Sequence, residues 1–409
     1  MQSLPRRTFW LFFAIAIPVG AYNGFVSFAL GSLARSSGLS VGESARIIGL
    51  CSLPFSLGNL LGPVVDFGFT KRVWLLLTSL LGAILLGMSL AIPLSRQGAL
   101  FAACAVTAGF LLIVTQAAGG ALVAAATPAP QKGRAAAWTF AGIIFGAIIG
   151  SAGILLLLSE LPVRLSVPIL VPSFFLPALA VLAMRERPRD DEPAGRQRFL
   201  RIGNELKAMF TDHYALTGLL IFLSPVPSQA ASNLFTAIAP DYRTGERAVA
   251  LITGVGGNLI SLVGVAAAGW ICDRLDRRYA YMLGGLYLGT CSALLIVLPP
   301  TPVSYVVGTS LYMIGAGYVF AAAFALAFDL VGDGGITGGT RIGFYMGALS
   351  LAVLYCTVTE GWIYDHAGRR AMFGLDTTFN LAGVLVMTLV LRSLGKRTER
   401  KLAASPAGG

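Results

Sequence analysis

The sequence has few side chains that could support catalysis or bind a metal ion. It contains two histidines, His213 and His366, and five cysteines that lie far apart in or beside apolar segments. No Cys-x-x-Cys pair or Cys/His spacing typical of a zinc site occurs. The sequence also lacks a Walker A loop and a nucleophile elbow. We therefore expect neither an enzyme nor a metalloprotein, and we expect no cofactor.

Acidic side chains are rare in the apolar segments. Glu360 follows a long apolar stretch, Asp365 comes about a turn later, and Asp329 ends the preceding apolar segment. An ionisable group inside a bilayer is a functional candidate by default. Glu360 is therefore our candidate for a carboxylate that couples transport to protons. The alternative is that all three acids lie at the membrane interface.

Uncharged polar side chains also interrupt the apolar segments. Two of these segments also contain helix-breaking residues. One has Pro18, Gly20 and Gly24, and the other has Pro225 and Pro227. Interrupted helices at matching positions of two halves are typical of a transporter's binding site. A single polar side chain, in contrast, more often forms a hydrogen bond between two helices. As a group they predict a polar, uncharged substrate cavity, with the candidates Tyr22, Asn23, Gln116, Gln229, Asn233, Tyr312 and Tyr345.

A Gly-x-x-x-Asp pattern followed by basic residues occurs twice, 207 residues apart. Its glycine would let neighbouring helices approach closely, and its carboxylate could bind a basic side chain or a helix N-terminus. The pattern predicts a conformational latch in each half, the alternative being ordinary helix-end charge. The latch candidates are Gly62, Asp66, Lys71 and Arg72 in the first copy and Gly269, Asp273, Arg277 and Arg278 in the second.

The elements that would position these residues are membrane helices. Of 409 residues, 56% are hydrophobic and 12% are charged, and the mean hydropathy is +0.77. Soluble chains carry about 25% charged residues. The apolar runs approach the ~20 residues that span a bilayer. The hydropathy pattern predicts twelve transmembrane helices, at 9–32, 45–65, 73–94, 99–126, 136–158, 162–184, 214–239, 247–271, 279–298, 303–330, 342–364 and 373–394.

The repeat and the one long polar segment divide the chain. We expect an all-α polytopic membrane protein of two pseudo-symmetric six-helix bundles, at residues 1–184 and 213–409, the second ending in a short cytoplasmic tail. Residues 185–212 would form a cytoplasmic linker that ends in an amphipathic surface helix.

The basic residues predict the orientation of these helices. With the N-terminus in the cytoplasm, 22 of the 30 Lys and Arg residues lie in inner loops and tails. This asymmetry favours a multi-pass protein of the bacterial inner (plasma) membrane with both termini in the cytoplasm. It also explains the net charge of +11 without a nucleic-acid partner, since no basic stripe with interleaved aromatics occurs.

The fifth predicted helix carries a ridge of small residues, Gly142, Gly146 and Gly150. Its spacing resembles the antiporter motif of drug exporters. Ala147 stands where that motif has proline, and Ser151 stands where it has its last glycine. We therefore interpret the ridge as a surface for close helix packing.

The paired Gly-x-x-x-Asp patterns resemble the loop motif of the major facilitator superfamily. Within it, the chain resembles the AmpG-like muropeptide permeases and acetyl-coenzyme A transporters, at residues 48–54, 74–78, 133–138, 340–350 and 361–362. The resemblance implies the major facilitator fold, with Asp66 latching the cytoplasmic side when the transporter faces outward and Asp273 playing the equivalent part.

The function implied is secondary active transport of a small organic solute by alternating access. Proton-coupled, AmpG-like uptake of a peptide, sugar-peptide or siderophore-like solute fits the resemblance, although helix four has no acid where muropeptide permeases carry one. The alternatives are a drug or metabolite exporter working as a proton antiporter and a membrane-embedded transferase. The expected partners are the solute, protons and the lipid bilayer, and we expect a monomer.

Overall fold

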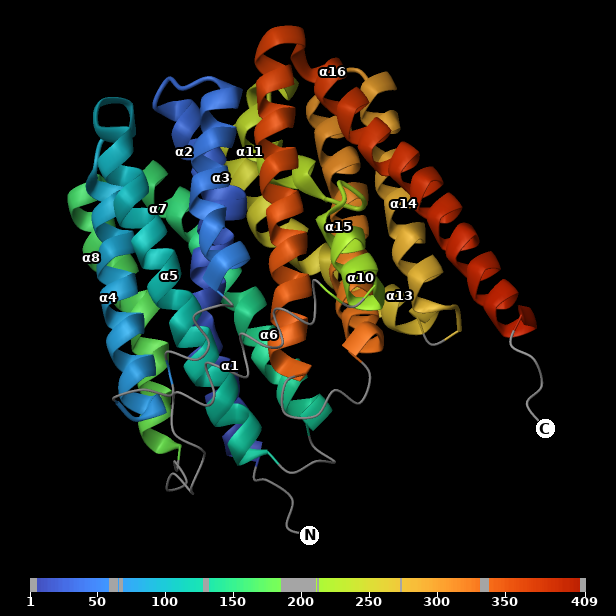
Figure 1. The fold of residues 1–409 in the computed structure, drawn as a ribbon. Coiled ribbons are helices and arrows are strands. Elements are labelled where there is room, and N and C mark those ends of the chain that lie inside the picture. Colours follow the sequence, from blue (N-terminus) through green and yellow to red (C-terminus); the bar gives the residue numbers. More distant parts are fainter. Residues whose placement is uncertain are drawn as a thin grey trace.

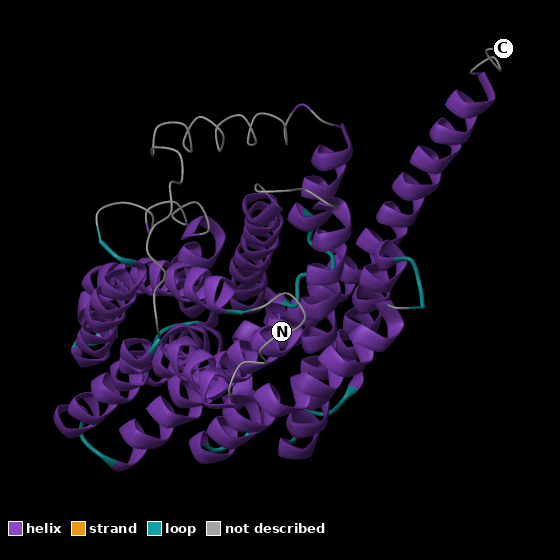
Figure 2. Ribbon diagram, turned by 90° about the horizontal axis from the view of Figure 1, so that it is seen from below, coloured by secondary structure: helices purple, strands orange, loops and turns teal. Residues whose placement is uncertain are grey.

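The computed structural model describes residues 6–58, 65, 69–127, 132–184, 211, 213–272, 274–331 and 338–404. These residues form helices and connecting turns, with no strand among them (Figures 1 and 2). We call residues 6–184 the first half and residues 211–404 the second half. The domain boundaries predicted at 184 and 213 flank residues that lie outside the description, and they stay a prediction.

The first half crosses the helical bundle six times. The first crossing is α1 (Arg6–Gly24), continued by η1 (Phe25–Ala29) and α2 (Leu30–Ser36). The others are α3 (Val41–Leu57), α4 (Lys71–Ala91), α5 (Leu94–Ala126), α6 (Lys132–Ile148) with η4 (Ile149–Gly153) and α7 (Ile154–Glu160), and α8 (Val163–Phe175) with η5 (Leu176–Ala183).

The second half also crosses six times. Its first crossing is broken into α10 (His213–Leu223), η6 (Ala230–Leu234), α11 (Phe235–Ile238) and η7 (Ala239–Tyr242). There follow α12 (Glu246–Val249) with η8 (Ala250–Gly256) and α13 (Gly257–Cys272), then α14 (Arg277–Val297), α15 (Pro302–Val331) and α16 (Gly338–Ala404). The last element is two crossings, because the chain turns back at Gly368, whose φ is 75°.

The twelve crossings confirm the predicted fold class. Nine described helices are individually long and apolar enough to span a bilayer. The number is lower than twelve for local reasons. The two arms of α16 run together, the seventh crossing is broken, and α3 ends at Leu57, just before residues outside the description.

Local sequence sets where several helices begin. Ser40 caps α3 with a capping box, in which its hydroxyl accepts from the backbone N–H of Glu43 and the Glu43 carboxylate accepts from the backbone N–H of Ser40. Thr70 and Asp276 cap α4 and α14 through their side chains. Such caps satisfy backbone donors that a helix leaves unpaired. We call the end of the bundle where α1 begins the N-terminal face and the opposite end, where α3 begins, the Ser40 face (Figure 1).

The predicted glycine ridge packs directly on the first helix. A Cβ atom added at Gly142, Gly146 or Gly150 would lie 2.1, 2.2 or 1.8 Å from a main-chain oxygen of α1. From the other side, a Cβ at Gly20 would lie 2.1 Å from the oxygen of Ile143. The backbones of α1 and α6 are thus in contact, which only glycine allows at these positions.

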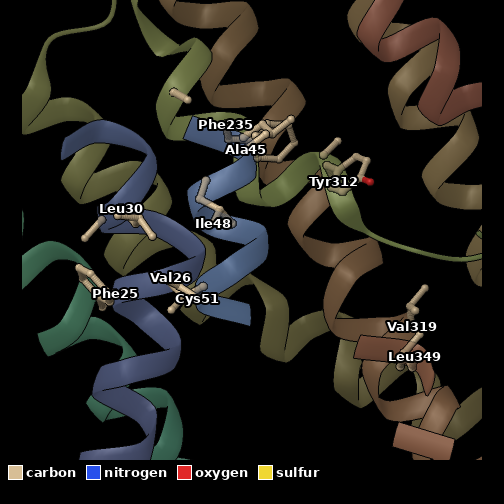
Figure 3. Packing of buried hydrophobic residues seen from close by; sticks show 14 of the residues in the cluster. Phe25, Val26, Leu30, Ala45, Ile48, Cys51, Phe235, Tyr312, Val319 and Leu349 are labelled. Atoms are coloured by element: carbon tan, nitrogen blue, oxygen red, sulfur yellow. The ribbon is translucent and has the colours of Figure 1, made fainter. Parts of the chain in front are cut away.

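Buried apolar residues of both halves form one continuous cluster (Figure 3). Val26 and Ile48 of the first half belong to it, as do Phe235 and Tyr312 of the second. The closest contact between halves runs along α3 and the first arm of α16, which lie side by side (Figure 1). The interface between halves is therefore packed rather than open along these two helices.

Candidate functional site

Glu360 is fully buried in the first arm of α16. Glu360 therefore lies inside the helical bundle, and its part in proton coupling stays a prediction. Its carboxyl lies beside Asp376, close enough for the two groups to interact. Neither of its oxygens has a hydrogen-bond partner of good geometry. A buried carboxyl group with no donor aimed at it is costly when ionised.

Asp376, in the second arm of α16, is surrounded by hydrogen-bond donors. The hydroxyl of Ser292 on α14 donates to Oδ2. The hydroxyl of Tyr312 on α15 lies 3.3 Å from both carboxylate oxygens, and Nδ2 of Asn380 donates to Oδ1 at 3.1 Å. All four side chains are fully buried. The two buried acids therefore differ in their surroundings. Asp376 accepts hydrogen bonds from three side chains, whereas Glu360 accepts none from the described residues.

Sequence reasoning missed Asp376 and its partners. The predicted twelfth helix begins at residue 373, three residues before Asp376, and Asp376 is not among the acids that the sequence analysis considers. Its spacing of four from Asn380 places both side chains on one helix face, and that face lies in an apolar segment. This spacing is the signal that could have identified the site.

The broken seventh crossing contacts this site twice. Nδ2 of Asn233, in η6, donates to the hydroxyl of Thr357 at 3.1 Å, and Thr357 lies one turn before Glu360 on α16. The ring of Phe235 meets the ring of Tyr312 edge to face at 5.1 Å (Figure 3). Asn233 and Tyr312 are buried, the first bonded to Thr357 and the second to Asp376. Their role as cavity residues stays a prediction.

The remaining cavity candidates separate into two kinds. Asn23 and Gln116 are exposed in the middle of long helices, and Gln229, at the break before η6, is partly exposed with φ 49°. Tyr22 and Tyr345 are buried, and their hydroxyls donate to the main-chain oxygens of Cys51 at 2.6 Å and Ala215 at 3.4 Å. The two tyrosines therefore hold helices together, which is the alternative role weighed for them.

The predicted latches lie partly outside the description. Gly62, Asp66 and Asp273 are not among the described residues. Lys71 and Arg72 begin α4, Arg277 forms an ion pair with Asp329 at 2.9 Å, and the backbone N–H of Arg278 donates to the Asp276 cap. A Cβ added at Gly269 would meet no described atom within 4 Å, so none of the described helices approaches closely there. The latch at the N-terminal face stays a prediction.

The Ser40 face carries contacts between the halves that the sequence did not predict. Asp365, on α16, accepts hydrogen bonds from the hydroxyl of Ser40 and from the backbone N–H of Gly42 at 2.9 Å. A Cβ added at Gly361 would lie 2.2 Å from the Cβ of Ala45. Arg247 forms an exposed ion pair with Glu160. We call the Asp365 and Gly361 contacts with α3 the Ser40-face gate.

The comparison with known families decides the identity of this fold. A sequence model of the Major Facilitator Superfamily matches residues 9–339. The chain belongs to this superfamily. No curated protein matches the sequence significantly. As a major facilitator protein, the chain is a multi-pass membrane protein of a transporter family, not an enzyme family.

Solved structures of the same fold have little sequence identity to this major facilitator protein. A D-xylose–proton symporter aligns with TM-score 0.72 and 16% identity, covering 93% of this chain and 96% of its own. The nucleoside transporter NupG gives 0.72 and 11%, covering 95% and 99%. A POT family transporter in complex with a conjugated peptide gives 0.70 and 13%, covering 95% and 96%. At these identities the likeness shows the fold alone.

Proposed function

We propose that this major facilitator protein is a secondary active transporter that moves a small organic solute by alternating access, with protons as the coupling ion. The direction proposed is uptake across a bacterial inner membrane, with the N-terminal face in the cytoplasm. The orientation rests on the Lys and Arg asymmetry. The family supports transport of a small solute.

The observation that carries proton coupling is the buried carboxyl group of Glu360. A solute carrier that draws on a proton gradient needs a group that gains and loses a proton as the carrier changes conformation. Glu360 is a buried acid that could take this part, and the next residue is Gly361, where the two halves touch. A structural neighbour is described as a proton symporter, which is consistent with this coupling.

The solute class follows from the exposed amides and from the family resemblance. Asn23, Gln116 and Gln229 present amide groups, which donate and accept hydrogen bonds but carry no charge. An amide exposed to lipid would be unsatisfied, so we place these side chains on a water-filled cavity. Peptides, sugar-peptides and siderophore-like solutes offer the matching hydroxyl and amide groups, in line with the AmpG-like resemblance.

Uptake by reconstituted vesicles tests the proposal. Purified protein in liposomes is offered pools of labelled sugars, nucleosides, short peptides and sugar-peptides, with and without a pH gradient. We expect one pool to accumulate only when the outside is acidic. Glu360→Gln should abolish accumulation while solute exchange without a gradient persists, because a permanently neutral side chain cannot release a proton. Vesicles with Asp329→Asn serve as the control, since Asp329 pairs with Arg277 away from Glu360.

Export by proton antiport is the alternative within the same family. It would appear as loss of solute from preloaded vesicles when the outside is acidic, because solute and protons then move in opposite directions. The glycine ridge that resembles the antiporter motif packs on α1, so it serves helix packing here and does not by itself favour export. The absence of accumulation in every pool, in either direction, would refute transport of these solute classes.

A further inference from the structure

We infer that Glu360 and Asp376 form one proton-binding site in which Glu360 carries the proton, and that its occupancy stabilises the closed Ser40-face gate. This inference rests on the proposed transport function and adds a second acid, an assignment of the proton to one member, and a structural link to the gate. The pair belongs to the two arms of α16, which meet at depth after the turn at Gly368.

The donors around the pair assign the proton. Asp376 accepts hydrogen bonds from Ser292, Tyr312 and Asn380, and hydrogen bonds to a carboxylate favour its ionised form. Both oxygens of Glu360 are buried without a donor. Two carboxylates this close cannot both be ionised at low cost, so the group without donors is the one that holds the proton.

Among the described residues, none around the pair supplies a positive charge that could replace that proton. The titratable groups that act on the two acids are Tyr312, Cys356 and Cys291. Tyrosine and cysteine side chains are neutral at pH 7. Among the described residues that act on the pair, none is a cation. A proton on Glu360 therefore leaves a single negative charge, which the three donors to Asp376 stabilise.

Two routes connect this site to the contact between the halves. Along α16, Gly361 follows Glu360 directly and packs on Ala45 of α3, and Asp365 binds the N-terminal end of the same helix. Through the broken crossing, Asn233 and Phe235 touch Thr357 and Tyr312. The same segment reaches the first half at Thr236, whose hydroxyl lies against Gly31 of α2.

The coupling follows from charge burial. When Glu360 loses its proton to water, the site holds two negative charges and donors for only one. Relief requires water to reach the Glu360 carboxylate, and α16 must shift away from its neighbours to admit water. The shift separates Gly361 from Ala45 and Asp365 from Gly42, so deprotonation favours an open gate and protonation a closed one.

Infrared spectroscopy of the purified protein in a detergent without ester groups, whose carbonyl would overlap the band of interest, tests the site without any solute. At pH 7 exposed carboxyl groups are ionised, so a protonated-carboxyl C=O band reports buried acids. We expect this band in the wild-type protein, its loss in Glu360→Gln, and its retention at a shifted frequency in Asp376→Asn. Asp329→Asn, which alters an exposed ion pair, is the control and should leave the band unchanged.

Three results would overturn the inference. A band that survives Glu360→Gln and disappears in Asp376→Asn would assign the proton to the other acid. The absence of a protonated-carboxyl band in the wild-type protein would show that both acids are ionised. Loss of the wild-type band on adding sodium at constant pH would show a cation site. Because no result depends on solute transport, failure here is distinct from failure of the uptake experiment.

Discussion

The carboxylate of Asp365 caps the first turn of α3, accepting a hydrogen bond from the backbone N–H of Gly42 at 2.9 Å. The two residues lie 323 positions apart in the sequence, one in each half of the protein. A carboxylate at a helix N-terminus binds the unpaired backbone N–H groups and the positive end of the helix dipole. The sequence predicted this kind of contact for Asp66 at the opposite face, and the structure shows it at the Ser40 face.

Replacing Asp365 with Asn should loosen the Ser40-face gate. Asn keeps an acceptor for Gly42 but removes the charge, whose interaction with a helix N-terminus is worth about 0.3–1 kcal/mol, and up to about 2 when partly buried. About 1.4 kcal/mol changes an equilibrium tenfold. A single cysteine at Thr236, which belongs to α11 and is buried against Gly31 of α2, should therefore react several-fold faster with a polar thiol reagent.

The matched control for this experiment is Asp241→Asn. Asp241 accepts a hydrogen bond from Tyr364 within the second half, so its replacement alters a contact at the same face without touching α3. The reaction rate at position 236 should stay close to that of the parent. Equal rates in Asp365→Asn and the parent would show that the cap does not hold the gate.

Replacing Gly146 with Ala should destabilise the first half. The added Cβ would lie 2.2 Å from the main-chain oxygen of Ile17, so α1 and α6 would have to separate. Overpacking of this kind costs about 1–3 kcal/mol. Gly269→Ala is the matched control, because its Cβ would meet no described atom within 4 Å. Thermal unfolding in detergent should show a lower midpoint for the first variant alone, and equal midpoints would contradict the observed backbone contact.

Cysteine labelling should separate the cavity candidates from packing residues. In a variant without its five native cysteines, cysteine at Asn23 or Gln116 should react with small aqueous thiol reagents, because both side chains are exposed. Cysteine at Thr115 should not, since the Thr115 side chain is buried against Thr78. If positions 23 and 116 are as inert as position 115, they face lipid or packed helices and do not line a cavity.

The proposed orientation predicts the behaviour of reporter fusions. Alkaline phosphatase fused after Gly195 or at the C-terminus should be inactive, and green fluorescent protein at either site should fluoresce. The reason is that 22 of 30 basic residues fall on the side assigned to the cytoplasm. Active phosphatase at either position would reverse the orientation.

The fold could be predicted because its signals are visible in the sequence itself. These signals are the length of each apolar segment and the repeat of the Gly62–Asp66 pattern at Gly269–Asp273. The site could be predicted only in part. Glu360 was identified from its place in an apolar segment, but its partner Asp376 lies near the start of the next helix, where a charge looks interfacial. Their proximity depends on the turn at Gly368, which brings the start of the second arm back beside the end of the first.

The roles of single polar side chains were harder to predict. Asn233 and Gln116 look alike in sequence, each an amide in an apolar segment, yet one is bonded to Thr357 and the other is exposed. Which face of a helix meets a neighbour depends on packing across the two halves, and hydropathy does not encode it. The Ser40-face gate has the same origin, since Asp365 and Gly42 become partners only in the folded protein.

In the proposed mechanism, the proton on Glu360 controls the gate between the halves. The most direct test of this control is the distance between spin labels at Ser36 and Ala367, two exposed positions on opposite sides of the gate, measured by double electron–electron resonance in lipid without native cysteines. We predict a short distance at low pH and growth of a longer-distance population as the pH rises. In Glu360→Gln without solute, we predict a distribution that stays weighted toward the short distance and does not change with pH. A wild-type distance that does not change with pH, or a Glu360→Gln distance that changes as the wild type does, would contradict the account.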